Sequence, residues 1–296
     1  MLAIIIPYYK LTFFEETLQS LANQTDKRFS VYIGDDASPE NPAALLEKYK
    51  DKLEFKYHRF SENLGSISLT KQWERCIALS KDEEWLMILG DDDVLGVNVV
   101  EEFYLQLPLF KGKTNVVRFA TEVINGNHEA ITNKFVHPVW EDAADSYYRK
   151  FERISRSSLS EYIFAKKAYI KYGFYNYPLA WNSDDRAWLD FTDSMPIYSI
   201  NESIVYVRKS EINITGKTDN LMFKDHSSVE FHKFLILNKF KYYNKLQRVK
   251  IVRKYHLELM RIKSLNLRDY VFIYKYYFFN INYKAIKGFL KKFVNI

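Results

Sequence analysis

Short apolar runs alternate with amphipathic stretches along the first 120 residues of the chain. The runs predict strands, most of them buried on both faces, at residues 2–6, 30–34, 53–57, 85–89 and 115–120. Stretches with apolar residues at helical spacing begin near Thr12, Asn41, Ser66 and Val99. Thr12 followed by Glu15 predicts a capping box at the first of these helices. Strands that alternate with helices predict the α/β class, with a mostly parallel central sheet and helices on both faces.

The pattern is less regular in the second half of the chain. Residues 121–158 show no clear period, and we predict loops and short elements there. A strand follows at residues 160–164, then a helix at 167–172 that ends at Gly173, a helical segment from Ser183 and a strand at 204–207. From about residue 228 the apolar residues keep helical spacing. We therefore predict one α/β domain over residues 1–220 and a helical extension over residues 221–296.

Charge divides the chain in nearly the same place. Residues 233–296 contain 16 Lys or Arg and two acidic residues, a net charge of +14, whereas residues 1–232 contain 27 basic and 35 acidic residues, a net charge of −8. The basic segment also contains 15 aromatic residues. This composition favours an anionic membrane surface as a partner. A helical cap with buried aromatic residues is the alternative, and nucleic acid is an unlikely partner.

Two further features bear on location. Cys76 is the only cysteine, which excludes a disulfide within the chain and is typical of a reducing compartment. No signal peptide is readable at the start, and no apolar run approaches the roughly 18 residues needed to span a bilayer. We expect a cytoplasmic protein, peripheral at the inner face of the plasma membrane if the basic segment binds lipid.

Three acidic clusters border the predicted elements, at Asp35-Asp36, Asp91-Asp92-Asp93 and Asp184-Asp185. Clustered carboxylates repel one another unless a cation or hydrogen-bond donors compensate. Oxygen ligands favour Mg²⁺ or Mn²⁺, which typically take one or two carboxylates together with substrate phosphates. The first two clusters follow strands, where parallel sheets bind their ligands. The alternative for each cluster is a solvated turn or a helix cap.

Four short motifs in a fixed order carry a family resemblance. They are Ile4-Ile5-Ile6-Pro7-Tyr8-Tyr9-Lys10, Gly34-Asp35-Asp36-Ala37-Ser38, Asn63-Leu64-Gly65 and Leu89-Gly90-Asp91-Asp92-Asp93. The ordered set, over roughly residues 1–210, resembles glycosyltransferase family 2 with its GT-A fold. The resemblance implies an inverting, metal-dependent enzyme of the hexosyltransferase type that uses a nucleotide-sugar donor.

The resemblance also implies roles for single residues. It assigns nucleotide binding to Pro7, Tyr9, Asp35, Asp36 and Asp91. In the family, the residue at Tyr9 stacks on uracil, the one at Asp36 bonds the edge of the base, and the one at Asp91 approaches the ribose. Asp92, with Asp93 possible as a second ligand, would bind the Mg²⁺ or Mn²⁺ that bridges the diphosphate. This chain departs from the family at Gly90, where an aspartate is frequent, so the sequence leaves open which carboxylate is the direct ligand.

A second acidic motif lies in residues 179–188 and resembles the Glu-Asp motif of the family. An inverting transfer needs a base that accepts the proton of the acceptor hydroxyl. The resemblance assigns this role to Asp185, with Asp184 orienting the acceptor and Trp181 stacking on a sugar face. The alternative is that Asp184 caps a helix and Trp181 belongs to the core.

These features predict transfer of a sugar from a UDP-sugar, or a related nucleotide sugar, to an acceptor hydroxyl. A glycan or lipid-linked acceptor in bacterial surface polysaccharide assembly is the expected setting. A nucleotidyltransferase is one alternative, but it should carry a Gly-rich phosphate loop after the first strand, and Pro7–Lys10 contains no glycine. A non-catalytic nucleotide-sugar binding protein is the other, and it could dispense with Asp185.

Overall fold

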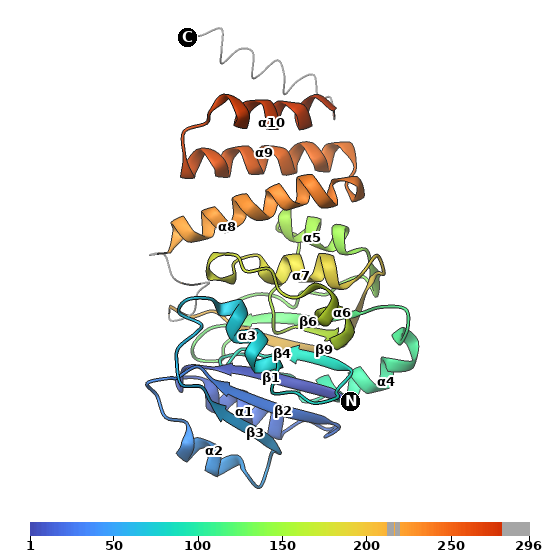
Figure 1. Ribbon diagram of the computed structural model, residues 1–296. Helices are drawn as coiled ribbons and strands as arrows, with labels where there is room; N and C mark the ends of the chain where they lie inside the picture. Colours follow the sequence, from blue (N-terminus) through green and yellow to red (C-terminus); the bar gives the residue numbers. More distant parts are fainter. Residues whose placement is uncertain (212–215, 217–219, 280–296) are drawn as a thin grey trace. The chain divides into compact units, whose positions relative to one another are not determined.

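The computed structural model describes residues 1–211, 216 and 220–279 (Figure 1). The chain forms two compact units, the first of Met1–Asn176 with Ser183–Lys217 and the second of Tyr177–Asn182 with Thr218–Ile296. We predicted a division after residue 220 from the hydrophobic pattern. The second unit also includes residues 177–182, which no pattern indicated.

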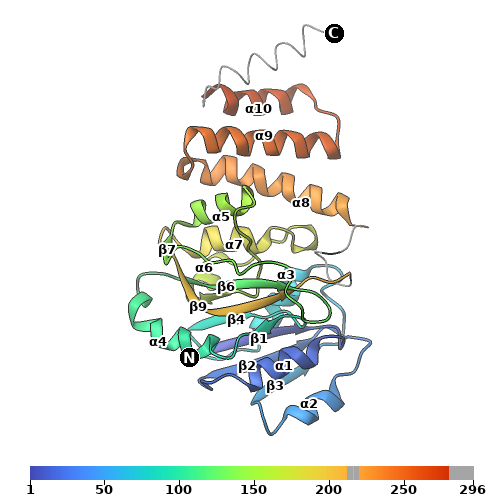
Figure 2. The ribbon, with the colours of Figure 1, turned by 180° about the vertical axis from the view of Figure 1, so that it is seen from behind.

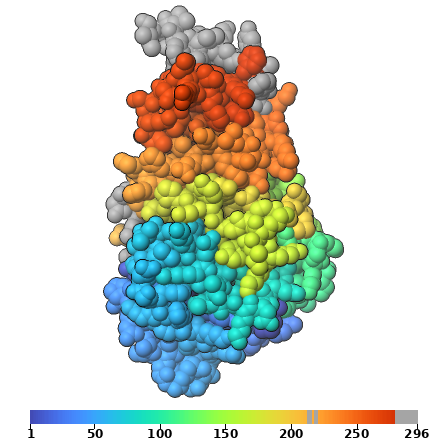
Figure 3. Space-filling model, in the orientation of Figure 1, coloured from blue at the N-terminus to red at the C-terminus, as the bar shows by residue number. Residues whose placement is uncertain are grey.

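Four parallel strands form one half of the central sheet of the first unit. They lie in the order β3-β2-β1-β4 and are β1 (Leu2–Tyr8), β2 (Phe29–Asp35), β3 (Phe55–Arg59) and β4 (Trp85–Ile88). β1 is central and almost fully buried, so little of it is visible in the space-filling view (Figure 3). Its register pairs Tyr8 with Asp35 of β2. The loops that follow these strands therefore start at the same edge of the sheet.

The other half of the sheet is mixed. It contains β5 (Val94–Leu95), β6 (Val116–Ile124), β7 (Trp140–Glu141), β8 (Tyr162–Ala165) and β9 (Ile197–Arg208). β8 lies antiparallel between β4 and β6, β6 is parallel to β9, and β5 and β7 pair antiparallel with β9. The predicted α/β class is confirmed, and the parallel character is limited to β3-β2-β1-β4 and the β6–β9 pair.

Among its described residues, the first unit has seven α-helices that connect these strands. They are α1 (Phe14–Ala22), α2 (Ala43–Tyr49), α3 (Leu69–Ile77), α4 (Val99–Phe110), α5 (Ala143–Phe151), α6 (Lys166–Tyr172) and α7 (Ser183–Phe191). α1 and α3 lie on opposite faces of the sheet (Figures 1 and 2). Right-handed crossovers explain this, because the chain moves outward from β1 to β3 and then returns across the sheet to β4. The predicted helices on both faces are thus present.

One local prediction was wrong. The capping box at Thr12 and Glu15 does not form, because α1 begins at Phe14 with Phe13 in the cap position and without a side-chain cap hydrogen bond. Within residues 121–158, where we predicted loops and short elements without naming a helix, α5 extends over nine residues. Its apolar face is narrow, since only Ala144, Ser146 and Tyr147 are buried.

The described part of the second unit is helical. It contains a 3₁₀ turn, η1 (Pro178–Ala180), then α8 (Leu221–Phe234), a π-helical turn η2 (Leu235–Lys239), a 3₁₀ turn η3 (Phe240–Tyr242), α9 (Lys245–Ile262) and α10 (Leu267–Phe279). Asn244 and Gln247 form a complete capping box at α9. The buried apolar residues of these helices include Phe231, Leu235, Ile251, Val252, Tyr255 and Ile273. No helix in the described ranges is both long and apolar enough to cross a membrane.

Candidate active site

The loops that follow β1, β2 and β4 enclose a cleft of about 530 Å³. Its lining consists of Pro7, Tyr9, Lys10, Phe13, Asp36, Asn63, Gly65, Ser66, Leu69, Trp73, Ile88, Gly90, Asp91, Asp92, Asp93, Ser158, Leu159, Ser160, Val207 and Arg208. Six of the residues that we predicted for nucleotide or metal binding are among them: Pro7, Tyr9, Asp36, Asp91, Asp92 and Asp93. This edge of the sheet is where a parallel sheet binds its ligand.

Asp91 connects the loop after β4 to the loop after β1 through hydrogen bonds. Its Oδ2 accepts hydrogen bonds from the backbone N–H groups of Tyr9, at 2.7 Å, and Lys10, at 2.8 Å. Burial raises the pKa of this carboxyl group to about 6, against the lowering effect of the two N–H donors. The two predicted nucleotide-binding residues Tyr9 and Asp91 are therefore held together by the backbone itself.

Asp36 lines the neighbouring part of the cleft. Its carboxylate accepts from the N–H groups of Leu64, at 2.8 Å, and Gly65, at 2.9 Å, and pairs with Arg75. Burial raises its pKa. A Cβ atom on Gly65 would lie 2.4 Å from Oδ2 of Asp36, so only glycine allows this approach. The close backbone contact explains the glycine of the Asn-Leu-Gly motif.

Asp35 does not reach the cleft. Its side chain is fully buried and accepts hydrogen bonds from the Ser38 N–H at 2.8 Å, the Tyr57 hydroxyl at 2.5 Å and Nη1 of Arg59 at 2.8 Å. These contacts stabilise the turn after β2. The nucleotide contact that the resemblance implies for Asp35 stays a prediction.

Asp92 and Asp93 differ in their surroundings although they are adjacent. Asp93 is buried, and its two oxygens accept hydrogen bonds from the Ser160 hydroxyl at 2.5 Å and from the backbone N–H of Arg208 at 2.8 Å. Burial and the charge of Asp92 raise the pKa of Asp93 to about 7. Asp92 is half-buried. Asp92 Oδ1 and Asp93 Oδ2 each lie 3.0 Å from the point that a Cβ atom on Gly90 would occupy, so they converge on one place.

The donor set agrees with a divalent cation held by few protein ligands. Within the described ranges, no three His, Cys, Asp or Glu residues gather as a metal site. Mg²⁺ and Mn²⁺ sites of this kind use one or two carboxylates, and phosphate and water oxygens complete the shell. Asp92 lines the cleft and is half-buried, which fits such a role, whereas Asp93 is buried and both of its oxygens accept hydrogen bonds from the protein.

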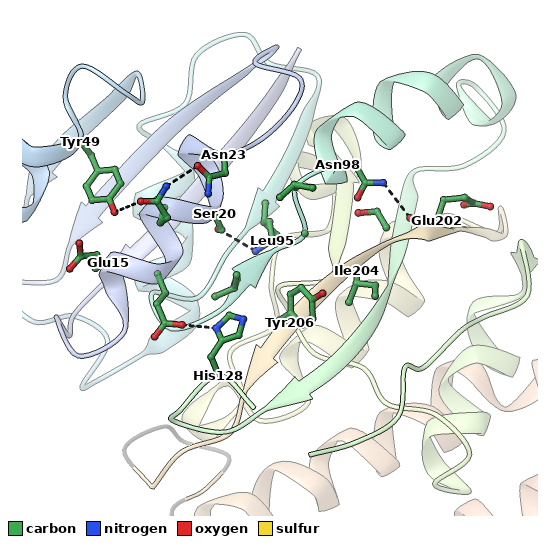
Figure 4. Close-up of a pocket in the computed structure, with 16 residues that line it drawn as sticks. Glu15, Ser20, Asn23, Tyr49, Leu95, Asn98, His128, Glu202, Ile204 and Tyr206 are labelled. Carbon is green, nitrogen blue, oxygen red and sulfur yellow. Dashed lines mark hydrogen bonds and ion pairs between the residues drawn. The ribbon is translucent and has the colours of Figure 1, made fainter. Parts of the chain in front are cut away.

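Arg208 contacts the loop that carries Asp92 and Asp93. Its Nε donates to the Asp92 carbonyl at 2.9 Å, its Nη2 pairs with Glu16 at 2.6 Å, and its guanidinium lies 4.3 Å from the centre of the Phe13 ring. Glu16 also bonds Nδ1 of His128, at 2.6 Å, at the border of a separate hollow of about 570 Å³ along α1 (Figure 4).

The second acidic motif occupies the first turn of α7 and is not part of the cleft lining. Asp185 has a side chain only 3% exposed, and its two oxygens lie 2.6 and 2.8 Å from Nζ of Lys150 on α5. Asp184 is half-buried. Burial and the charge of Asp185 raise the pKa of Asp184 to about 7. The predicted role of Asp185 as the base stays a prediction, and its ion pair with Lys150 was not expected.

Trp181 belongs to the second unit. The ammonium nitrogen of Lys224 lies 4.9 Å from the centroid of the Trp181 ring. The adjoining residues Leu179, Ala180 and Asn182 all have positive φ angles, of 58°, 53° and 68°. Such a run of strained non-glycine residues requires strong support from its surroundings. The predicted sugar contact of Trp181 stays a prediction.

Sequence reasoning missed three residues that organise the site: Ser160, Lys150 and Trp73. Ser160 donates to Asp93 and accepts from the Gly90 N–H at 3.1 Å. Lys150 lies in the segment where no helix was predicted. Trp73 was assigned only to the inner face of α3, and it also lines the cleft. None of these positions has a local sequence signal for its role, because each acts on a partner far away in the chain.

Comparison with known proteins supports the family resemblance and shows the fold. Residues 3–133 match the model of the family described as Glycosyl transferase family 2, which confirms the resemblance predicted from the motifs. No curated protein sequence is significantly similar to this chain.

Solved structures show the same fold at low sequence identity. S. aureus TarS residues 1–349 in complex with UDP-GlcNAc superposes with a TM-score of 0.62 and 16% identity, covering 80% of this chain and 66% of that one. GalNAc-T7 with UDP, GalNAc and Mn²⁺ gives a TM-score of 0.56 and 13% identity, covering 85% of this chain and 50% of that one. The chain thus spans slightly less than two thirds of the first structure and half of the second. The predicted GT-A architecture is confirmed.

Proposed function

We propose that this chain, of which residues 3–133 match glycosyltransferase family 2, is an inverting glycosyltransferase. It would move a sugar from a UDP-sugar, or a related nucleotide sugar, to an acceptor hydroxyl. The observation that carries the proposal is the cleft itself. There Asp91 is tied to the backbone of Tyr9 and Lys10, and Asp92 follows it at the open edge of the sheet. Two similar structures contain a nucleotide or nucleotide sugar, UDP-GlcNAc in TarS and UDP in GalNAc-T7.

The nucleotide would lie along the loops after β1 and β4. Tyr9 supplies an aromatic face for the base, and Asp36, whose backbone N–H donates to the Tyr8 carbonyl at 3.1 Å, also lines the cleft. Oδ2 of Asp91 already accepts two N–H groups, which leaves Oδ1 for a ribose hydroxyl. Asp91 would thus position the ribose on a loop that it also holds in place.

Asp92 would hold Mg²⁺ or Mn²⁺, with Asp93 fixed behind it by Ser160 and Arg208. When bound, such a cation stabilises the charge that develops on a departing diphosphate. The residues of this chain contribute by keeping the Asp92 loop in place. Arg208 does so through the Asp92 carbonyl at 2.9 Å.

Transfer also requires that the acceptor hydroxyl lose its proton. The two carboxylates at the start of α7 are the candidates, because both belong to the motif that resembles the Glu-Asp motif of the family. General-base catalysis typically contributes roughly 10²–10⁴-fold to a rate. Trp181 could offer a face to a sugar ring of the acceptor.

A panel of nucleotide sugars tests the proposal. Thermal unfolding would be followed with each donor, with and without Mn²⁺, because a ligand of the native state raises the melting temperature. We expect one UDP-sugar to stabilise the protein only when Mn²⁺ is present. Failure of every nucleotide sugar to raise the melting temperature would contradict the proposal.

Product analysis separates the alternatives. A glycosyltransferase releases UDP from the donor, a nucleotidyltransferase releases or consumes pyrophosphate, and a binding protein does neither. We expect slow, metal-dependent release of UDP from the stabilising donor. Pyrophosphate chemistry would favour the nucleotidyltransferase instead.

The setting that we propose is a membrane surface, where a lipid-linked acceptor of a surface polysaccharide would be found. Between residues 221 and 279 the second unit exposes apolar side chains beside its basic ones, including Leu246, Leu257, Met260, Leu267, Val271 and Phe278. Each exposed Lys or Arg contributes about 1 kcal/mol near an anionic leaflet. Flotation with liposomes of graded anionic lipid content should show binding that weakens with salt. Equal, negligible flotation at all lipid compositions would contradict it.

A further inference from the structure

A second hollow lies along α1 in the first unit, apart from the cleft. It has a volume of about 570 Å³ and is bordered by α1, the end of α2, β5, β9 and the loop that carries His128. The described residues that line it are all different from those that line the cleft. Its volume lies within the range of about 300–1,000 Å³ that is typical of sites for small ligands.

The middle of the hollow is apolar and its border is polar. Leu95, Ile204 and Tyr206 lie in its middle (Figure 4). Asn23, at the end of α1, and Glu202, on β9, lie at its two sides. Tyr206 is half-buried, so part of its ring is open to a ligand. Small-ligand sites typically combine such an apolar lining with a few polar groups that fix the orientation of the ligand.

We propose that the hollow is a second sugar-binding site, which takes a neutral mono- or disaccharide. A sugar ring carries C–H groups on its two faces and hydroxyl groups around its edge, so it fits an apolar middle with a polar border. Binding there requires neither a nucleotide nor a metal ion. The proposal therefore goes beyond the glycosyltransferase function and does not depend on it.

Glu16 supplies a fixed acceptor at one end of the hollow. Its Oε2 lies 2.6 Å from Nη2 of Arg208 and 2.6 Å from Nδ1 of His128. Among the described residues, its Oε1 has no hydrogen bond, so this oxygen can accept from a ligand hydroxyl. Because two partners already hold the Glu16 side chain, little further ordering is needed when a ligand binds.

Ser203 supplies an unpaired hydroxyl. The residue lies on β9, lines the hollow and is only 1% exposed, and within the described ranges its Oγ has no hydrogen-bond partner. Buried hydroxyls nearly always have a partner, because an unpaired one is unfavourable. Gly96, which also lines the hollow, leaves space beside this hydroxyl, since a Cβ atom on Gly96 would lie 3.6 Å from Oγ. A hydroxyl of a bound sugar would supply the missing partner.

The charges around the hollow favour a neutral ligand over a cation. Three carboxylates line it, those of Glu15, Glu16 and Glu202. Glu15 pairs with Lys48. Glu16 pairs with Arg208. Because two of the three carboxylates already have a cationic partner, a further cation gains little there, whereas sugar hydroxyls can still donate to the remaining lone pairs.

Saturation-transfer NMR with free sugars tests the proposal. The probes are glucose, galactose, mannose, N-acetylglucosamine, N-acetylgalactosamine and maltose, each added to the full chain without nucleotide or metal. Spermidine is the cationic comparison. We expect at least one sugar to bind, and UDP with Mn²⁺ should not displace it, because the cleft and the hollow have different linings.

Three variants show where the sugar binds. Tyr206→Ala removes the ring in the middle of the hollow and should lower the affinity for the sugar by about tenfold. Ser203→Ala removes the unpaired hydroxyl and should lower the affinity by up to about tenfold, without lowering the melting temperature, because no contact within the described ranges is lost. Trp181→Ala is the matched control. It removes the aromatic side chain that we propose for the acceptor and should leave this affinity unchanged.

Three results would overturn the proposal. One is that no sugar binds, or that only spermidine binds in a way that depends on Tyr206. Another is displacement of the sugar by UDP with Mn²⁺. The third is loss of binding in Trp181→Ala with unchanged binding in Ser203→Ala, which would place the sugar at the acceptor side instead. If Tyr206→Ala does not fold, Ser203→Ala decides alone. Failure of the proposed function is distinct, because it is measured by release of UDP from a donor, which none of these experiments requires.

Discussion

The acidic segments Asp91–Asp93 and Asp184–Asp185 look alike in the sequence and differ in how their charge is balanced. In each, one carboxylate is enclosed and its neighbour is half-buried. The enclosed Asp93 is held by a hydroxyl and a backbone N–H, both uncharged donors. The enclosed Asp185 is held by the ammonium group of Lys150.

This difference indicates what each segment can bind. The two donors that hold Asp93 carry no charge, whereas both oxygens of Asp185 lie against an ammonium group, and we expect a cation from solution to bind at the first segment. Lys150 already supplies a cation at the second segment, so a metal ion has little to gain. We therefore expect one metal-binding segment and one proton-transfer segment, although both are runs of aspartate.

The largest expected effect is at Asp92. Asp92→Ala should abolish the Mn²⁺-dependent part of the affinity for UDP, because it removes the carboxylate that we propose as the ligand. Loss of one electrostatic stabiliser of this type typically lowers kcat by roughly 10²–10³-fold. Isothermal calorimetry with UDP, with and without Mn²⁺, measures the first effect directly.

Two other variants serve as controls for the UDP-binding measurement on Asp92→Ala. Asp51→Ala, at an exposed position, controls for general loss of negative charge. Asp184→Asn should leave the Mn²⁺ dependence of UDP binding intact, because the second segment has its own cation. Loss of metal dependence in Asp184→Asn would mean that the two segments are not separate in function.

Most of the parallel half of the sheet was predictable, and the mixed half was not. The strands β1, β2 and β4 are short apolar runs buried on both faces, which the pattern alone indicates. The placement of β8 depends on pairing of Phe164 with Leu86 and Val116, which are distant in the chain. α5 was missed because only three of its nine residues are buried, and one of these three is a serine. Local patterns carry no information about such long-range pairing.

The same limit applies to the candidate site. The motifs identified the residues that line the cleft, because the order of strands brings their ends together. They could not separate Asp92 from Asp93, since the donors to Asp93 are Ser160 and Arg208, 67 and 115 positions away. Nor could they separate Asp184 from Asp185, whose partner Lys150 lies 35 positions away.

The next effect concerns stability at the second segment. Asp185→Asn should destabilise the protein by about 2 kcal/mol at neutral pH, because Lys150 loses its counterion. Breaking a fully buried pair typically costs about 3–5 kcal/mol. The Lys150 side chain is 29% exposed, so water reduces the loss here. Urea unfolding measures it, and a variant as stable as the original would show that the ion pair is not formed in solution.

A smaller effect is expected from Gly90→Ala at the first segment. The new Cβ would lie 3.0 Å from carboxylate oxygens of both Asp92 and Asp93, so it should push the two apart. We expect the Mn²⁺-dependent affinity for UDP to fall by about tenfold, or roughly 1.4 kcal/mol. The affinity measured without Mn²⁺ should not change. A fall in both affinities would indicate a disturbed loop rather than a disturbed metal site.

The smallest effect is a gain in stability from Asp184→Asn, and it depends on pH. The pKa of Asp184 is raised in the folded protein to about 7 from the ordinary value of 3.8, so its charged form is disfavoured by folding. This disadvantage is absent below the ordinary pKa, grows as the pH rises and is complete above about pH 7. Asparagine carries no charge and avoids it at every pH. In thermal unfolding, Asp184→Asn should therefore have a higher melting temperature than the original protein at pH 8. Each kcal/mol of stability gained corresponds to about 2–4 °C. The difference in melting temperature should shrink toward pH 4. Asp185→Asn should show the opposite sign at pH 8, because it loses the contact with Lys150. If both variants lower the melting temperature equally at pH 8, the two aspartates share one environment, contrary to their different contacts with Lys150.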